Sequence, residues 1–238
     1  MKAGILYPAS KQYPAGGVQF CEGIKKATRS TGIALSWESV DHGGSEDVVV
    51  KAAEKLFIIN EVEVLVAFLD YRVLEKLSAL AGSLSKQVLV VNPGANYPLN
   101  WQNPAWENLS FLTLQQAFSC YLSGSRAAQV PPTTLMGMLY DAGYLQTYAF
   151  DRGINEHGGE ITAQYYSKDF GLRPLNDAAA IGQFLQAHQP LSVGLTADAQ
   201  SGYFFCKAMA DAGYTHNVYG SPMLAEWKAE PGEVTAWP

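Results

Sequence analysis

Cysteine is scarce in this chain of 238 residues, which contains only three: Cys21, Cys120 and Cys206. They lie far apart, and no CxxC pair occurs, so the sequence gives no indication of a zinc site or of thioredoxin-type chemistry. We interpret the three side chains as buried free thiols, and one long-range disulfide is the alternative that the sequence leaves open.

Positive charge is also scarce, with 16 lysines and arginines against 22 aspartates and glutamates and a net charge of −6. Nucleic acids bind to basic surfaces, so this balance argues against a nucleic-acid partner. No apolar run approaches the roughly 18 residues of a membrane-spanning helix, and the short apolar stretch after Lys2 does not read as a signal peptide. The residues alone leave two locations open, the cytoplasm or, for a chain whose signal peptide is not in this sequence, the space outside it.

The common signatures of nucleotide binding and catalysis are missing as well. Neither GxGxxG nor GxxxxGK[ST] follows the first predicted strand, and neither GxSxG nor HExxH occurs anywhere. The four histidines are scattered along the chain and are expected in loops or on helix faces. The sequence therefore predicts no cofactor, no metal site and no catalytic residues, although an enzyme that assembles its site from distant residues stays an alternative.

Strand-like and helix-like segments alternate along the whole chain. Residues 62–68 are apolar and β-branched, as in a strand buried inside a parallel sheet, and residues 73–80 carry a helical apolar stripe. Other strands are predicted at 3–7, 33–37, 88–91, 111–114, 135–140, 161–166, 191–196 and 218–220. Strands joined by single helices run parallel. The pattern predicts an α/β fold of two Rossmann-like lobes with parallel sheets joined by a hinge.

We place the lobe boundary near the irregular segment 92–108 and the Pro131-Pro132 break. The predicted first lobe spans 1–118, the second spans 119–225, and 226–238 begins a crossover back to the first lobe. Long irregular segments in compact α/β domains are often functional.

Polar and aromatic residues follow several predicted strands. Because the carboxyl ends of parallel strands meet at one edge, where ligands of open α/β sheets bind, these residues form the candidate site. In the first half they are Ser10, Tyr13, Asp70, Tyr71 and Asn96, and in the second half Tyr144, Thr196 and Asp198. Each has an ordinary alternative; Asp198, for example, also suits a helix N-cap. Their coincidence at the same predicted edges favours a small-molecule site.

The order of these segments resembles that of the type I periplasmic binding proteins, especially the leucine/isoleucine/valine-binding receptors of ABC transporters. The matching segments are Pro8-Ala9-Ser10 with Tyr13, Leu69-Asp70-Tyr71, Asn92-Pro93-Gly94-Ala95-Asn96, Gly194-Leu195-Thr196-Ala197-Asp198 and Tyr219-Gly220-Ser221-Pro222. The resemblance implies two lobes that close on a ligand by a hinge motion, a periplasmic or extracellular location, and a membrane permease as partner. It also implies that the protein is not an enzyme.

The resemblance further implies roles for individual residues. An amino acid's carboxylate would be held in the first lobe by Ser10, Tyr13, the turn of Leu69, Asp70 and Tyr71, and the turn of Ala95 and Asn96. Tyr144 would close over the ligand, and Asp198, which follows Thr196, would hold its ammonium group.

The sequence departs from the family pattern in several places. Asp70 stands where amino-acid binders commonly have a small hydroxyl residue, and its carboxylate would suit a cation or a polyol better than an anion. The sequence also stops about where family members return to the first lobe, so we expect that the return elements are absent.

The resulting hypothesis is a solute-binding protein that captures a small polar or amino-acid-like ligand for ABC-type uptake, as a monomer or weak dimer. One alternative is a ligand-sensing domain of the same fold in a signalling or regulatory protein. The other is an α/β enzyme with Asp70, Tyr144 and Asp198 as acid–base groups.

Overall fold

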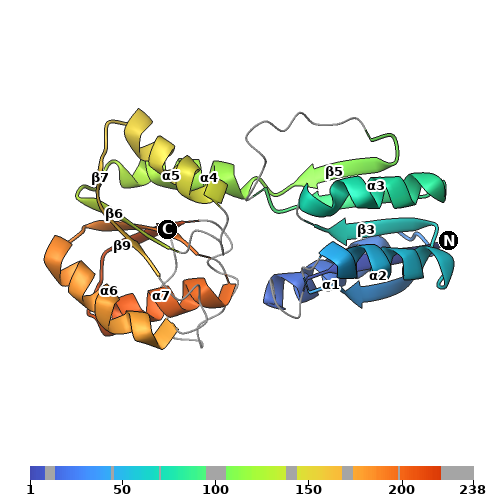
Figure 1. The fold of residues 1–238 in the computed structure, drawn as a ribbon, viewed down its shortest axis with the longest axis horizontal. Helices are drawn as coiled ribbons and strands as arrows, with labels where there is room; N and C mark the ends of the chain where they lie inside the picture. Colours follow the sequence, from blue (N-terminus) through green and yellow to red (C-terminus); the bar gives the residue numbers. More distant parts are fainter. Residues whose placement is uncertain are drawn as a thin grey trace. The chain divides into compact units, whose positions relative to one another are not determined.

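The computed structural model describes residues 1–8, 14–43, 46–69, 71–94, 106–137, 144–167, 174–197 and 199–220 (Figure 1). The chain divides into two compact units, Met1–Leu114 and Gln115–Pro238, which are described separately below. This division lies a few residues before the lobe boundary predicted after residue 118. The predicted crossover at 226–238 lies outside the described residues.

The first unit is a parallel sheet with helices on both faces. Its strands are β1 (Lys2–Tyr7), β2 (Ser36–Asp41), β3 (Val64–Phe68), β4 (Gln87–Asn92) and β5 (Leu109–Thr113). Its helices are α1 (Pro14–Ser30), α2 (Glu46–Ile58), the 3₁₀ turn η1 (Tyr71–Val73) and α3 (Leu74–Ser83). The strand order is β2-β1-β3-β4-β5, and every pairing is parallel. All five strands therefore end at the same edge of the sheet.

Side chains of β3 point alternately to the two faces of the sheet, and they form the centre of the first unit's core. Leu65 and Ala67 are fully buried and pack into one cluster with residues of α2 and α3, such as Leu56 and Leu77. On the opposite face Phe68 makes an edge-to-face contact with Phe20 of α1, with ring centroids 5.4 Å apart. Apolar residues at period 2 in the strand and period 3.6 in the helices thus fix which faces meet.

The second strand was predicted too early in the chain. The apolar residues Ile33, Ala34 and Leu35 precede it, and Ile33 is 56% exposed. The strand begins at Ser36, which pairs with Lys2, and continues to Asp41. A short apolar run is therefore less informative here than pairing with the central strand β1.

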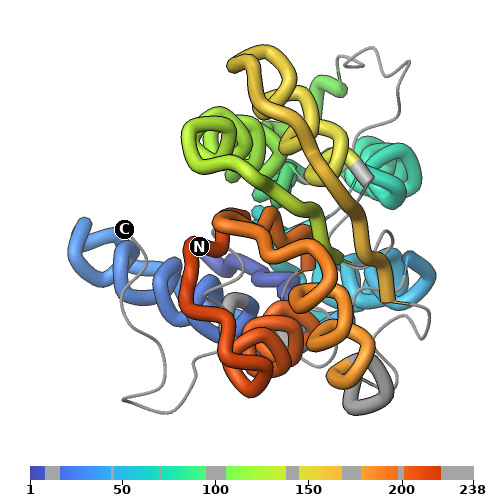
Figure 2. Tube along the Cα trace, turned by 90° about the vertical axis from the view of Figure 1, so that its left-hand side faces the viewer, coloured from blue at the N-terminus to red at the C-terminus, as the bar shows by residue number. Residues whose placement is uncertain are grey.

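The second unit has a four-stranded parallel sheet between two pairs of helices (Figures 1 and 2). Its strands are β6 (Thr133–Gly137), β7 (Ile161–Tyr166), β8 (Ser192–Thr196) and β9 (Asn217–Gly220), in the order β7-β6-β8-β9. Its helices are α4 (Gln116–Ala127), α5 (Tyr144–Glu156), α6 (Pro174–His188) and α7 (Ala199–Asp211). Helices α4 and α5 cover one face, and α6 and α7 cover the other.

None of the three cysteines forms a disulfide, as predicted: Cys21 and Cys120 are buried, and Cys206 is half-buried. Burial raises the pKa of the Cys206 thiol to about 11, so it is a poor nucleophile near neutral pH. None of the helices in the described part of the chain has the length and hydrophobicity needed to span a bilayer.

Two neighbouring threonines in the central strand β6 are both buried but differ in their hydrogen bonds. Thr133 Oγ1 donates to Ala127 O (3.2 Å) and lies 2.7 Å from Ser192 Oγ. Thr134 Oγ1 has no partner among the described residues. An unpaired buried hydroxyl costs free energy that an isosteric methyl group avoids.

We therefore expect Thr134→Val to raise the free energy of unfolding by roughly 1 kcal/mol, whereas Thr133→Val should lower it by roughly 1–3 kcal/mol because it leaves buried groups unpaired. Urea denaturation measures both, provided the slope of each transition is unchanged. Equal destabilisation by the two substitutions would show that Thr134 also has a partner.

Candidate functional site

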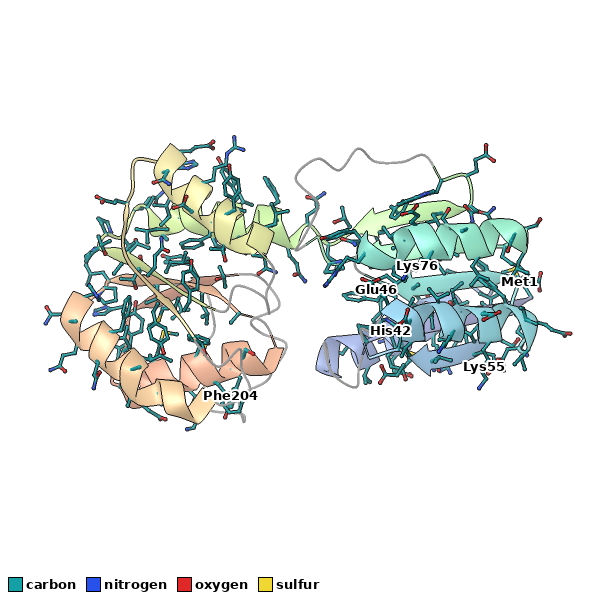
Figure 3. All side chains as sticks on the ribbon, viewed as in Figure 1. Met1, His42, Glu46, Lys55, Lys76 and Phe204 are labelled. Carbon is teal, nitrogen blue, oxygen red and sulfur yellow. The ribbon has the colours of Figure 1, made fainter. Side chains whose placement is uncertain are left out.

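The carboxyl edge of the first sheet is organised by His42, which follows the last residue of β2. Its backbone N–H donates to Tyr7 O at the end of β1 (3.0 Å), and its ring Nε2 lies 3.0 Å from Phe68 O at the end of β3 (Figure 3). A carbonyl oxygen only accepts, so Nε2 carries the proton. His42 is only 4% exposed, and it joins the ends of three strands.

Asn92, the last residue of β4, makes hydrogen bonds to the backbone that follows β3, from the side opposite His42. Its Nδ2 donates to Leu69 O (2.8 Å), and its Oδ1 accepts from Gly94 N–H (2.7 Å). The backbone adds two further bonds, from Leu69 N–H to Val91 O (3.0 Å) and from Leu114 N–H to Asn92 O (2.8 Å). Asn92 is 4% exposed.

His42 and Asn92 therefore form hydrogen bonds to two successive carbonyl groups, those of Phe68 and Leu69, at the point where β3 ends. We call His42, Asn92 and these two carbonyls the turn clamp. Buried polar side chains that are fully hydrogen-bonded make the backbone around them rigid. The turn clamp therefore fixes the direction in which the chain leaves β3 toward Tyr71 and α3.

Burial lowers the pKa of the His42 imidazole below its ordinary value of 6.5, and the nearby Asp41 carboxylate partly opposes this shift. The neutral ring is thus favoured in the folded protein. Above about pH 6.5 the ring is neutral in both the folded and unfolded chains. As the pH falls below that value, the unfolded chain takes up the proton first, and stability is lost until the pH passes the lower folded pKa.

We expect His42→Gln to make stability less sensitive to acid, because an amide can donate to Phe68 O without titrating. The measurement is the urea midpoint of wild type and variant between about pH 5 and 8. Each pKa unit of depression corresponds to about 1.4 kcal/mol of wild-type stability lost in acid. Parallel pH curves for the two proteins would contradict this role of His42.

The carboxyl edge of the second sheet is closely packed around Thr196, the last residue of β8. Its hydroxyl accepts from Thr147 Oγ1 of α5 (3.1 Å) and donates to Met136 O of β6 (3.4 Å). A Cβ on Gly137 would lie 2.3 Å from Thr196 Oγ1, so the end of β6 requires glycine here. Thr196 is fully buried, and its hydroxyl joins the ends of β6 and β8 to the start of α5.

No family model and no curated protein matches this chain. Solved structures do match. A solute-binding protein of an ABC transporter from R. palustris, in complex with benzoate, aligns with a TM-score of 0.72 and 18% identity over 94% of this chain and 62% of that one. Another, from Rhodopseudomonas palustris BisB5 in complex with 3,4-dihydroxybenzoic acid, aligns with a TM-score of 0.69 and 17% identity over 94% and 62%.

The substrate-binding protein of a branched-chain amino acid transporter from Streptococcus pneumoniae, in complex with isoleucine, aligns with a TM-score of 0.69 and 13% identity over 92% of this chain and 63% of that one. This chain has the type I periplasmic binding fold. The predicted fold class is thereby confirmed, and the chain spans 62–63% of the length of these three proteins.

In this type I periplasmic binding fold, three of the predicted site residues have described side chains. Leu69 is 2% exposed with its N–H bonded to Val91 O, so it offers a ligand neither a side chain nor a free donor. Tyr71 begins η1 at the carboxyl edge, half-buried against the core of the first unit. Thr196 is buried in the contacts given above. Tyr144 is the first residue of α5, at the carboxyl edge of the second sheet.

The other predicted residues lie outside the described ones: Ser10, Tyr13, Asp70, Ala95, Asn96 and Asp198. Their roles stay predictions. Within the described ranges, no group of three or more histidine, cysteine, aspartate or glutamate side chains is arranged to hold a metal ion.

The turn clamp was not predicted from the sequence. His42 was expected in a loop or on a helix face, and Asn92 was read only as part of a turn. One signal was available: a side chain with both a donor and an acceptor directly after the apolar run 88–91. Its partner Leu69 is 23 positions away in the sequence, so the contact itself is visible only in the folded chain.

Proposed function

We propose that this chain is the solute-binding part of an ABC-type uptake system. It captures a small polar or amino-acid-like solute outside the cytoplasm and delivers it to a membrane permease, without catalysis. The observation that carries the proposal is the type I periplasmic binding fold together with the turn clamp. In open α/β sheets ligands bind beyond the carboxyl ends of the strands, and here that edge is held rigid by buried side chains.

The solutes named for the three solved proteins are benzoate, 3,4-dihydroxybenzoic acid and isoleucine, and all three carry a carboxyl group. This supports a small carboxylic acid or amino acid as the ligand of this chain. In the proposal Ser10, Tyr13 and Asn96 contact the solute from the first unit, and Tyr144 and Asp198 contact it from the second. Asp70 then faces a hydroxyl or ammonium group of the solute, because a carboxylate there repels another carboxylate.

The test is a thermal-shift screen of ligand-free protein against amino acids, aromatic and aliphatic acids, polyamines and sugars. A ligand at about 100 times its dissociation constant adds roughly 2.7 kcal/mol to stability, which a melting curve resolves. We expect a clear shift with at least one class of compound. A folded, ligand-free sample that responds to no compound and shows no binding in calorimetry would contradict the proposal.

The compound that shifts the melting curve then tests the site. The double substitution Asp70→Ala and Tyr144→Ala should weaken its binding by at least about tenfold, equivalent to about 1.4 kcal/mol. The matched control is Asp47→Ala with Tyr148→Ala, since both control side chains are exposed on helices, at 85% and 61%. Unchanged affinity in the first double variant would place the site elsewhere.

A further inference from the structure

The described part of the chain passes from the first unit to the second once, between Leu114 and Gln115. Leu114 directly follows β5 and Gln115 directly precedes α4, so the strand leads into the helix through these two residues alone (Figure 1). Both residues are exposed, and neither belongs to a buried core cluster of either unit. Packing therefore does not fix their backbone angles.

The backbone on either side of this connection is held by hydrogen bonds. Leu114 N–H donates to Asn92 O (2.8 Å), so the peptide group before Leu114 belongs to the first sheet. Gln115 O accepts from Ser119 N–H (3.0 Å), so the peptide group after Gln115 belongs to α4. Peptide groups are planar and rigid. A rotation of one unit against the other within this connection must therefore use the φ and ψ angles of Leu114 and Gln115.

Helix α4 is fixed to the second unit from its first residue. Gln116 is buried, and its side-chain amide is hydrogen-bonded to that of Gln146 in α5 (2.9 Å). One helical turn further along, a Cβ on Gly153 of α5 would lie 2.1 Å from Tyr121 O of α4, so the two backbones are in direct contact. This contact leaves α4 no room to tilt against α5. The helix therefore cannot absorb a rotation that the connection does not absorb.

Gln115 has an unusual backbone conformation for its position. It is left-handed, with φ of 52° and ψ of 41°, and makes no side-chain cap hydrogen bond, whereas a residue that precedes a helix is ordinarily extended and caps it. The other left-handed residues apart from glycine in the described ranges are Glu61, Ser85 and Gln189, and each follows the end of a helix, where this conformation is common. The conformation is costly for a side chain with a Cβ. The costly residue thus lies at the torsions on which the connection turns.

We propose that Leu114 and Gln115 are the hinge between the two units, and that the left-handed conformation of Gln115 sets the balance between alternative arrangements of the units. Hinges are commonly a few residues at the ends of elements that absorb changes in φ and ψ. The consequence for binding rests on the proposed solute-binding function. A solute that contacts both units favours one arrangement, so its apparent affinity depends on how populated that arrangement is. Gln115 is thereby a positioning residue that acts without touching the solute.

The experiment measures the distance between one spin label in each unit by pulsed electron paramagnetic resonance, on protein without added solute. The labels are attached through Asp47→Cys in α2 and Tyr148→Cys in α5, because the native side chains at these positions are 85% and 61% exposed. The three native cysteines are buried or half-buried, and mass spectrometry checks that they stay unlabelled.

Two substitutions at the hinge change the cost of the left-handed conformation in opposite directions. Gln115→Val raises it, because a β-branched residue is disfavoured there, and Gln115→Gly removes it. The matched controls are Ser85→Val and Ser85→Gly. Ser85 has φ of 54° and is exposed like Gln115, but it lies between α3 and β4, inside the first unit.

Gln115→Val should lower the population at the main wild-type distance about fivefold relative to other distances, and Gln115→Gly should not lower it. Both Ser85 variants should keep the wild-type distribution, although Ser85→Val melts at a lower temperature. Thermal melting confirms that each variant is folded. A folded Gln115→Val protein with the wild-type distribution would overturn the hinge assignment, and so would an equal change in Ser85→Val.

Calorimetry with benzoate, 3,4-dihydroxybenzoate and isoleucine tests the consequence for binding. A compound that binds wild type should bind Gln115→Val and Gln115→Gly with affinities shifted in opposite directions, by about threefold or more in one of them, and should bind both Ser85 variants as it binds wild type. Changed distances with unchanged affinity would show that the balance at Gln115 does not control binding. Failure of the proposed function looks different, because then no compound of the wider screen binds, while the distances still respond to Gln115→Val.

Discussion

Asn92→Ala is expected to weaken solute binding by at least about tenfold and to lower the free energy of unfolding by about 2–4 kcal/mol. The substitution removes the donor to Leu69 O and the acceptor for Gly94 N–H. Leu69 and Gly94 are both buried, so water does not readily replace the lost bonds. Each buried group left unpaired costs about 1–3 kcal/mol.

The effect on binding has a different origin from the effect on stability. The Asn92 side chain holds the carbonyl of Leu69, and the turn that follows carries the candidate residues Asp70 and Tyr71. Without that bond the turn has more conformational freedom, and the entropy lost when a ligand orders the turn reduces the free energy of binding. The expected loss of affinity therefore comes from poorer positioning of the turn, and not from a lost contact between Asn92 and the ligand.

Asn108→Ala separates the two effects. Asn108 also makes two side-chain hydrogen bonds, accepting from Ser78 Oγ (3.1 Å) and donating to Ser78 O (2.8 Å). It precedes β5 and so lies at the amino edge of the same sheet, away from the turn clamp. We expect both variants to lower the urea midpoint, and only Asn92→Ala to weaken the compound found in the thermal-shift screen.

Calorimetry on both variants, at a temperature where each is fully folded, measures the binding effect directly. Equal affinity of Asn92→Ala and wild type would show that the turn clamp serves stability alone. Asn92→Asp refines the result, because it keeps the acceptor for Gly94 N–H, loses the donor to Leu69 O and places a repelling carboxylate oxygen beside that carbonyl. Its affinity should fall nearly as far as that of Asn92→Ala.

The sequence predicted the fold well because the two signals that determine it are local. Apolar runs such as 62–68 and 88–91 are long enough to identify buried strands, and the stripe at 73–80 identifies the helix that covers them. The error at the second strand has the same basis. The apolar residues 33–35 looked like a strand, but pairing with β1, a contact distant in sequence, selects Ser36–Asp41.

The site was harder to predict, because contacts between strand ends are invisible in a linear pattern. Thr196 was chosen as a polar residue at a strand end, yet its hydroxyl is bonded to Thr147 and Met136 inside the second unit. Leu69 was chosen for its backbone, and its N–H is bonded to Val91 O.

The second large effect is expected from Gly153→Ala in α5. A Cβ at Gly153 would lie 2.1 Å from Tyr121 O and 3.1 Å from Ser125 N, both backbone atoms of α4. The reverse contact is equally close, since a Cβ at Gly124 would lie 2.2 Å from Phe150 O. Neither helix can move a side chain aside to relieve these contacts, so the helices themselves must separate.

Overpacking of this kind costs about 1–3 kcal/mol, and rigid backbone neighbours place Gly153→Ala at the upper end of that range. The higher helix propensity of alanine offsets up to about 1 kcal/mol. We therefore expect a net loss of about 2 kcal/mol in the free energy of unfolding. Gly182→Ala in α6 is the control, because its Cβ would meet only Ala212 Cβ at 3.6 Å, and the propensity gain should make that variant slightly more stable.

Hydrogen exchange shows which part of the chain is destabilised by Gly153→Ala. The α4–α5 contact belongs to the second unit, whose core clusters are separate from that of the first. Gly153→Ala should speed exchange in β6 and β8 and leave β1 and β3 protected as in wild type. Faster exchange in both units would instead mean that the two units unfold as one.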